Sequence, residues 1–127
     1  MDNDESAFSV SGRLRSVGLA GSGIIEMLKS QHNAWVHLVA TLCVVLVGLF
    51  CKVTVTEWCF LIMAIMVVWV AEALNTALEL LCDVASPDFH PLIKKSKDVA
   101  AGGVLLSALG AVSIGLIIFA PYLLALL

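Results

Sequence analysis

The sequence predicts an all-α membrane protein, with one N-terminal surface helix followed by three transmembrane helices. Three stretches, at about 34–51, 57–82 and 99–121, are apolar and long enough to cross a bilayer. Hydrophobic residues make up 61% of the chain and charged residues only 13%, which is far from the composition of a soluble domain. A chain of 127 residues has room for one such domain, so residues 1–127 are treated as a single unit.

The segment before the first span, at about 10–29, is amphipathic. It intersperses charged residues with leucine, isoleucine and valine, as in a helix that lies on the membrane surface, although its four glycines weaken the helix. Six of the seven basic residues lie in this segment or between spans two and three, whereas Lys52 lies between spans one and two. The positive-inside rule therefore predicts that the N-terminus and the 83–98 loop face the cytoplasm.

The second span ends in a polar stripe, within the segment from Trp69 to Asp83. On a helix its polar residues fall within an arc of roughly 100°. These residues are Glu72, Asn75, Thr76, Glu79 and Asp83. Carboxylates at membrane depth are costly, so they indicate a functional site. Two classes of function fit the stripe, namely an enzyme site near the membrane surface and the ion path of a small channel or transporter subunit.

The loop after the stripe favours the enzyme. It contains His90, three lysines and Asp98, and Lys97 and Asp98 are expected at the start of the third helix, where backbone N–H groups favour anions. Phosphoryl transfer needs a cation for phosphate oxygens, carboxylates that hold magnesium, and a base for the attacking hydroxyl. This arrangement suits a reaction between a water-borne polyanion and a membrane lipid.

The segment EALNTALELLCD, followed by HPLIKKSKDVAAGGVLLSA, resembles the signature region of the small bacterial integral-membrane lipid kinases, the diacylglycerol and undecaprenol kinases. The similarity is strong from Trp69 to Ala108. It implies a homotrimer in the bacterial inner membrane, with active sites between protomers. Such an enzyme uses ATP and Mg²⁺ to phosphorylate the hydroxyl of a membrane lipid and has no nucleic-acid partner. The similarity leaves open whether the lipid is diacylglycerol or undecaprenol.

The resemblance also assigns roles to residues that match the family pattern. Glu72 falls on the proposed catalytic base and Asn75 on its helper. Glu79 falls on a carboxylate at the metal and nucleotide, and Asp83 on a supporting acidic residue. The remaining nucleotide-binding positions are His90, Lys97, Asp98 and, one place away from the family's arginine, Arg13.

The chain departs from the family pattern at the start of span one. The family's Glu-x-Asn-x-Arg-x-His context reads QHNAWVH here, so Gln31 replaces the glutamate that is the second metal ligand. A glutamine oxygen can coordinate magnesium only without charge, so we expect weaker binding. A family member that has lost activity and acts as a binding or structural subunit is therefore an alternative. A disulfide between Cys51 and Cys59, which flank one short loop, is also left open.

Overall fold

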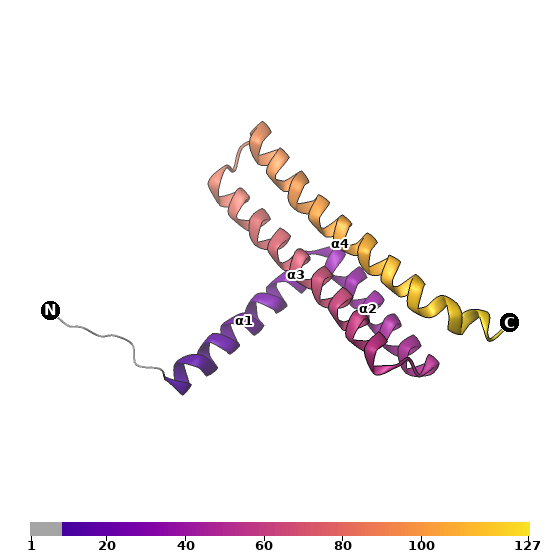
Figure 1. Ribbon diagram of the computed structural model, residues 1–127. Helices are drawn as coiled ribbons and strands as arrows, with labels where there is room; N and C mark the ends of the chain where they lie inside the picture. The colour runs from indigo at the N-terminus through magenta and orange to yellow at the C-terminus, as the bar shows by residue number, and fades with distance from the viewer. Residues whose placement is uncertain (1–8) are drawn as a thin grey trace.

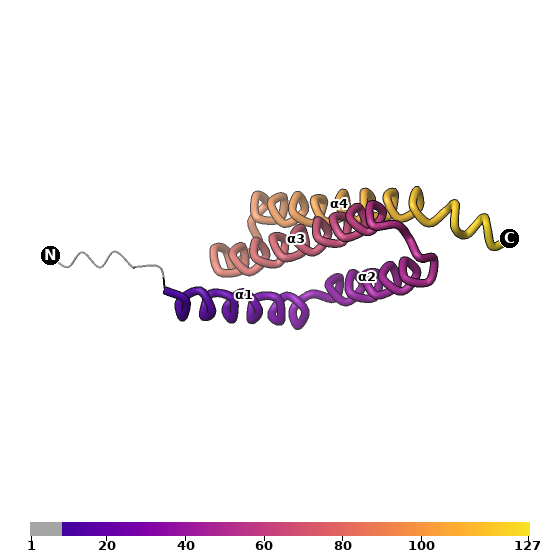
Figure 2. The backbone as a smooth tube through the Cα atoms, turned by 60° about the horizontal axis from the view of Figure 1, so that its bottom comes forward, coloured from indigo at the N-terminus to yellow at the C-terminus, as the bar shows by residue number. Residues whose placement is uncertain are grey.

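The computed structural model describes residues 9–127 as four helices (Figure 1). They are α1 (Val10–Ser30), α2 (His32–Cys51), α3 (Val55–Ala85) and α4 (Pro91–Leu124). α3 and α4 run antiparallel side by side over most of their length, and α2 packs against α3 in the half toward the C-terminal end of α4 (Figures 1 and 2). α1 diverges from this bundle (Figure 1). α2, α3 and α4 are long and apolar enough to cross a membrane, as the sequence predicts.

Local sequence signals explain the helix ends. Gln31 has an extended backbone (φ −118°, ψ 118°) and separates α1 from α2. Lys52 closes α2 in the left-handed conformation (φ 53°), which turns the chain back within three residues. Thr54 and Glu57 then form a capping box, because the threonine hydroxyl accepts from the Glu57 N–H while the Glu57 carboxylate accepts from the Thr54 N–H.

The hydrophobic core lies where the end of α2, the start of α3 and the end of α4 meet. Its buried members are Val53, Leu61, Ile118 and Phe119, and Trp58 packs against them. Gly48 allows this packing, since a Cβ built on it would lie 2.6 Å from Trp58 Cη2. At the edge of the core, Tyr122 Oη donates to Glu57 Oε2 at 2.7 Å, which links the start of α3 to the end of α4.

The prediction of a loop at 83–98 is wrong over most of that range. α3 continues to Ala85 and α4 begins at Pro91, so the connection is only residues 86–90. His90 caps α4, with its Nδ1 accepting from the Leu92 N–H at 3.2 Å, and proline at the first helical position is preorganised for a helix. Lys97 and Asp98 therefore lie about two turns inside α4, and the argument that they sit at an anion-binding helix start is also wrong.

Most large apolar side chains of the single chain point outward. In α1, Met27 is the only buried residue among those described. Within residues 9–127 the cysteines are free and only Cys82 is buried, so the Cys51–Cys59 disulfide is not formed. This outward apolar surface is what three spans present to lipid or to further chains.

Candidate functional site

The polar stripe of α3 faces inward against α2. Glu72 is 0% exposed, Asn75 5% and Thr76 4%, although the surrounding helix surface is largely open. Ala34 of α2 is also fully buried. Thr76 Oγ1 donates to the Glu72 carbonyl at 2.8 Å, which satisfies the hydroxyl without using the Glu72 side chain. The deeper part of the predicted site is therefore buried between α2 and α3, whereas Glu79 is partly exposed and Asp83 is exposed.

Gln31, Asn75 and Glu79 form one hydrogen-bonded cluster. Gln31 Nε2 donates to Glu79 Oε2 at 2.5 Å, and Asn75 Nδ2 donates to Glu79 Oε1 at 3.3 Å. Gln31 is the N-cap residue of α2, and its side chain makes no cap hydrogen bond, so its amide is available to α3. The structure thus brings together Glu79 and the unusual glutamine that the sequence paired with it.

Glu72 lies two turns deeper along α3, about 10 Å from Glu79 along the helix axis. Neither of its carboxylate oxygens has a hydrogen-bond partner within residues 9–127. His37 Nε2, from α2, lies 3.5 Å from Glu72 Oε2, and the two side chains are 14% and 1% exposed. A buried carboxylate with so few partners is costly, which supports a functional reason for its presence.

A second contact ties α2 to α3 one turn away. Trp69 Nε1 donates to Thr41 Oγ1 at 3.0 Å, and Thr41 Oγ1 donates to the His37 carbonyl at 2.7 Å. Sequence analysis assigned no site role to Trp69 or His37. Helical spacing places His37 and Thr41 on one face of α2, because they are four residues apart, but it does not show which residues of α3 that face meets.

Two ion pairs lie at the polar end of the α3–α4 pair. Lys97 Nζ donates to Asp83 Oδ1 at 2.5 Å, which joins the end of α3 to the second turn of α4. Lys94 and Asp98 form an exposed pair within α4 at 2.6 Å. Lys97 precedes the apolar part of α4, which begins near residue 99. Its hydrogen bond to the Asp83 carboxylate raises the pKa of Lys97, and the negative charge of Glu79 adds to the effect. Lys97 therefore carries a positive charge close to Glu79.

Two predicted nucleotide-binding residues stand apart from this cluster. Arg13 lies in the first turn of α1, about 27 Å from Gln31 along the helix. His90 is exposed, and its Nδ1 caps α4. Within one chain these two side chains do not converge on Glu79.

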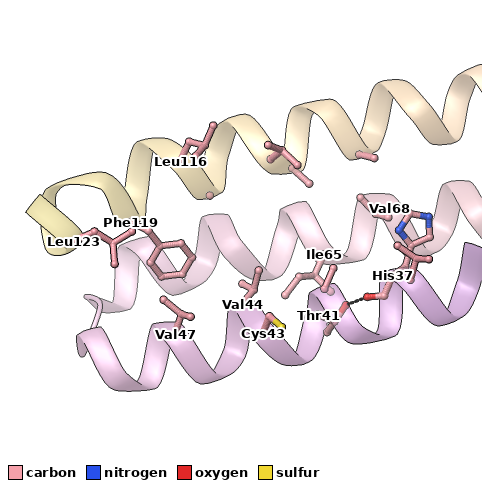
Figure 3. A pocket seen from close by; sticks show the side chains of 16 residues that line it. His37, Thr41, Cys43, Val44, Val47, Ile65, Val68, Leu116, Phe119 and Leu123 are labelled. Atoms are coloured by element: carbon pink, nitrogen blue, oxygen red, sulfur yellow. Dashed lines mark hydrogen bonds between the residues drawn. The ribbon is translucent and has the colours of Figure 1, made fainter.

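A groove of about 580 Å³ runs between α2 and α4 over α3 (Figure 3). Its lining is apolar except at one end, where His37 and Thr41 lie, and Phe119 and Leu123 line the opposite end (Figure 3). The groove is in the size range of ligand-binding pockets. Its polar end adjoins the buried Glu72 through His37.

Three membrane-length helices, with the fully buried carboxylate of Glu72 on one of them, define a helical membrane protein. The family described as prokaryotic diacylglycerol kinase matches residues 18–119. The chain is 33% identical to undecaprenol kinase from Bacillus subtilis (strain 168), over 97% of this chain and 100% of that protein. It is 32% identical to diacylglycerol kinase from Synechocystis sp., over 90% of this chain and 66% of that protein.

A third relative, diacylglycerol kinase from Helicobacter pylori (strain 26695), is 33% identical over 73% of this chain and 75% of that protein. The chain belongs to the prokaryotic diacylglycerol kinase family. The resemblance drawn from the EALNTALELLCD region is confirmed, and the protein is a membrane protein of a lipid-kinase family.

Proposed function

We propose that this protein transfers the γ-phosphoryl group of ATP to the hydroxyl of a membrane lipid. The observation that carries the proposal is the fully buried Glu72, whose two oxygens have no hydrogen-bond partner among the described residues. A carboxylate in that state is available to accept a proton from a hydroxyl brought next to it. Asn75, one turn nearer the end of α3, would orient the reacting groups, since its Oδ1 is also buried without a partner.

The lipid would approach from the apolar side of the bundle and the nucleotide from the polar end. The groove between α2 and α4 offers an apolar surface that leads to Glu72 through His37. Lys97, held by Asp83 near Glu79, would offset the negative charge of the phosphates. Phosphoryl transfer needs a base that removes the hydroxyl proton and a cation that neutralises the phosphate. Glu72 would act as the base and Lys97 as the cation.

The Glu79 cluster fits magnesium in part. Within residues 9–127 no three His, Cys, Asp or Glu side chains gather at one point, so these side chains alone provide no complete cage. Glu79, the Gln31 amide after rotation, and the orphaned Asn75 Oδ1 provide oxygen atoms, and magnesium commonly uses one or two carboxylates with water and substrate phosphates. When bound, the ion would neutralise charge on the transferred phosphate.

We further propose that the protein is a homotrimer in the bacterial inner membrane, with its N-terminus and the 86–90 connection in the cytoplasm. Two features support assembly. The α3–α4 surface next to Gly103 and Ser107 is an open apolar depression, and small residues there would let another helix approach closely. Arg13 does not reach Glu79 within one chain, so a neighbouring subunit would have to complete the nucleotide site.

Phosphate transfer to lipid tests the proposal. Purified protein in nanodiscs receives radiolabelled ATP, magnesium and either undecaprenol or diacylglycerol. We expect a labelled phospholipid product with at least one of the two alcohols. Product on undecaprenol alone would match the relative from B. subtilis, which is aligned over its whole length. Wild-type protein that labels neither lipid, while folded and able to bind ATP, would contradict the proposal.

A second candidate is a family member without kinase activity that acts as a binding or structural subunit. Gln31 favours it, because a neutral amide stands where the family has a second carboxylate and is hydrogen-bonded to Glu79. The two candidates separate in the same assay, since only the kinase forms product. If the wild type is inactive and the Gln31→Glu variant is active, the result would support the second candidate.

A further inference from the structure

We propose that His37 is a positioning residue for Glu72, holding one carboxylate oxygen through its ring Nε2–H and leaving the other free for the lipid hydroxyl. This inference rests on the proposed function, in which Glu72 is the base. His37 comes from α2 and Glu72 from α3, so the contact depends on how the two helices pack.

The first observation is the isolation of Glu72. Its carboxylate is buried, both oxygens lack hydrogen bonds within residues 9–127, and His37 Nε2 lies 3.5 Å from Oε2. That distance is longer than an ideal hydrogen bond, as is common at catalytic sites before substrate binds. A carboxylate with one oxygen held has a fixed plane, whereas one with no partner can rotate. Fixing the plane points the second oxygen in one direction.

The second observation is the contact that sets the position of His37. Trp69 donates to Thr41, and Thr41 donates to the His37 carbonyl. This chain anchors the α2 backbone at His37 to the α3 residue one turn before Glu72. The register of the two helices is thereby fixed next to the pair. Such an anchor serves orientation, because neither Thr41 nor Trp69 hydrogen-bonds to a Glu72 oxygen.

The third observation is where the imidazole lies. His37 lines the polar end of the groove between α2 and α4, whereas Glu72 does not line it (Figure 3). A hydroxyl that arrives along the groove therefore meets the His37 ring before the carboxylate. His37 is placed to orient both partners of the proton transfer, the base directly and the incoming hydroxyl at the groove end.

Two substitutions separate positioning from packing. His37→Phe keeps a planar ring and removes the donor, while His37→Gln keeps an N–H close to the Nε2 position. We expect His37→Phe to lower kcat about tenfold, a part of the roughly 10²–10⁴ that a general base supplies, with the KM for ATP unchanged. His37→Gln should recover most of kcat. In a Glu72→Gln background, His37→Phe should cause no further loss, because it acts through Glu72. His32→Phe, at an exposed histidine of the same helix, is the matched control.

A measurement without turnover tests the contact itself. The chain has three histidines, so ¹⁵N-histidine NMR in micelles gives few signals, which the His32 and His37 variants assign. We expect Glu72→Gln to shift the ring signals of His37 and to leave those of His32 and His90 in place. Unshifted His37 signals would overturn the inference whether or not the protein is active. Full kcat in a folded His37→Phe variant, or a loss that adds to that of Glu72→Gln, would also overturn it. A wild type that phosphorylates neither lipid would instead contradict the proposed function.

Discussion

Gln31→Glu is the substitution that most directly tests the Glu79 cluster. In the wild type, Gln31 Nε2 donates to Glu79 Oε2 at 2.5 Å. A glutamate at this position removes the donor and places a second carboxylate against the first. Two unit charges about 4 Å apart repel by about 4 kcal/mol at an effective dielectric constant of ~20. Glu79 is partly exposed, so water, rotation and shared protonation reduce this value, and we expect a net destabilisation of about 1–2 kcal/mol without metal.

The same change should strengthen magnesium binding. Magnesium depends mainly on charged oxygen ligands, and the variant offers two carboxylates where the wild type offers one. A gain of about 1 kcal/mol corresponds to a roughly fivefold lower magnesium concentration for half-maximal activity. The thermal midpoint should also rise more steeply with magnesium in the variant than in the wild type, because ligand binding stabilises the folded state. This second readout needs no turnover.

Two controls separate charge from the loss of the amide. Gln31→Leu removes the hydrogen bond without adding charge, so it should lower the metal-free midpoint and gain no magnesium dependence. His32→Glu adds a carboxylate at the neighbouring exposed position and should leave the magnesium titration unchanged. If Gln31→Glu has the wild-type magnesium titration and the wild-type metal-free midpoint, the placement of Gln31 against Glu79 is refuted as a determinant of metal binding.

Three other predictions follow from the structure. Glu72→Gln should lower kcat by about 10² or more while the oligomer, measured by cross-linking, is retained. Gly48→Ala should lower stability by about 1–2 kcal/mol, because its Cβ would lie 2.6 Å from Trp58 Cη2 and the overpacking exceeds the gain in helix propensity; thermal unfolding in detergent measures it. Cysteines introduced at Asp88 and Leu127, in a cysteine-free background, should react with impermeant reagent from opposite sides of the membrane.

Each of these has an outcome that contradicts it. A fully active Glu72→Gln enzyme would show that Glu72 has a structural role and not a catalytic one. Gly110→Ala is the matched control for Gly48→Ala, because nothing lies within 4 Å of a Cβ at Gly110, and it should be neutral or stabilising. Equal losses in both alanine variants would show that Trp58 does not explain the effect. Labelling of both introduced cysteines from the same side of the membrane would contradict the predicted topology.

The sequence predicted the fold well because bilayer thickness constrains it. Helix length and apolar composition set the three spans, and the structure confirms three helices of that kind. Boundaries were less accurate where a local signal outweighed composition. The prolines and charges of 83–98 indicated a loop, yet a capping histidine followed by proline starts α4 at Pro91. Charged residues extend a helix readily in water, so composition alone could not place that start.

The site was predictable to the extent that it lies on one helix. The spacing of Glu72, Asn75 and Glu79 put them on one face of α3, and all three lie at or near the buried α2 interface. The pairing of Gln31 with Glu79 came from the resemblance and agrees with the structure. His37 was missed because a lone histidine near the start of a span is usually an interfacial residue. Only the packing of α2 on α3 brings its ring to Glu72, and spacing along one helix carries no information about that.

The carboxylates of α3 lie in two environments, one buried and one exposed to water. Glu72 lies among side chains that exclude water, whereas Glu79 is partly exposed and Asp83 is exposed. Each step of one or two turns toward the end of α3 therefore moves a carboxylate from a dry interior toward water. A proton acceptor benefits from the interior, because fewer waters compete for its oxygens. Groups that meet a water-borne polyanion benefit from the exposed end, where the Asp83–Lys97 pair lies. A substrate with an apolar chain and a single hydroxyl can reach both regions at once, which is the physical reason to favour a lipid alcohol over an ion as the ligand of this stripe.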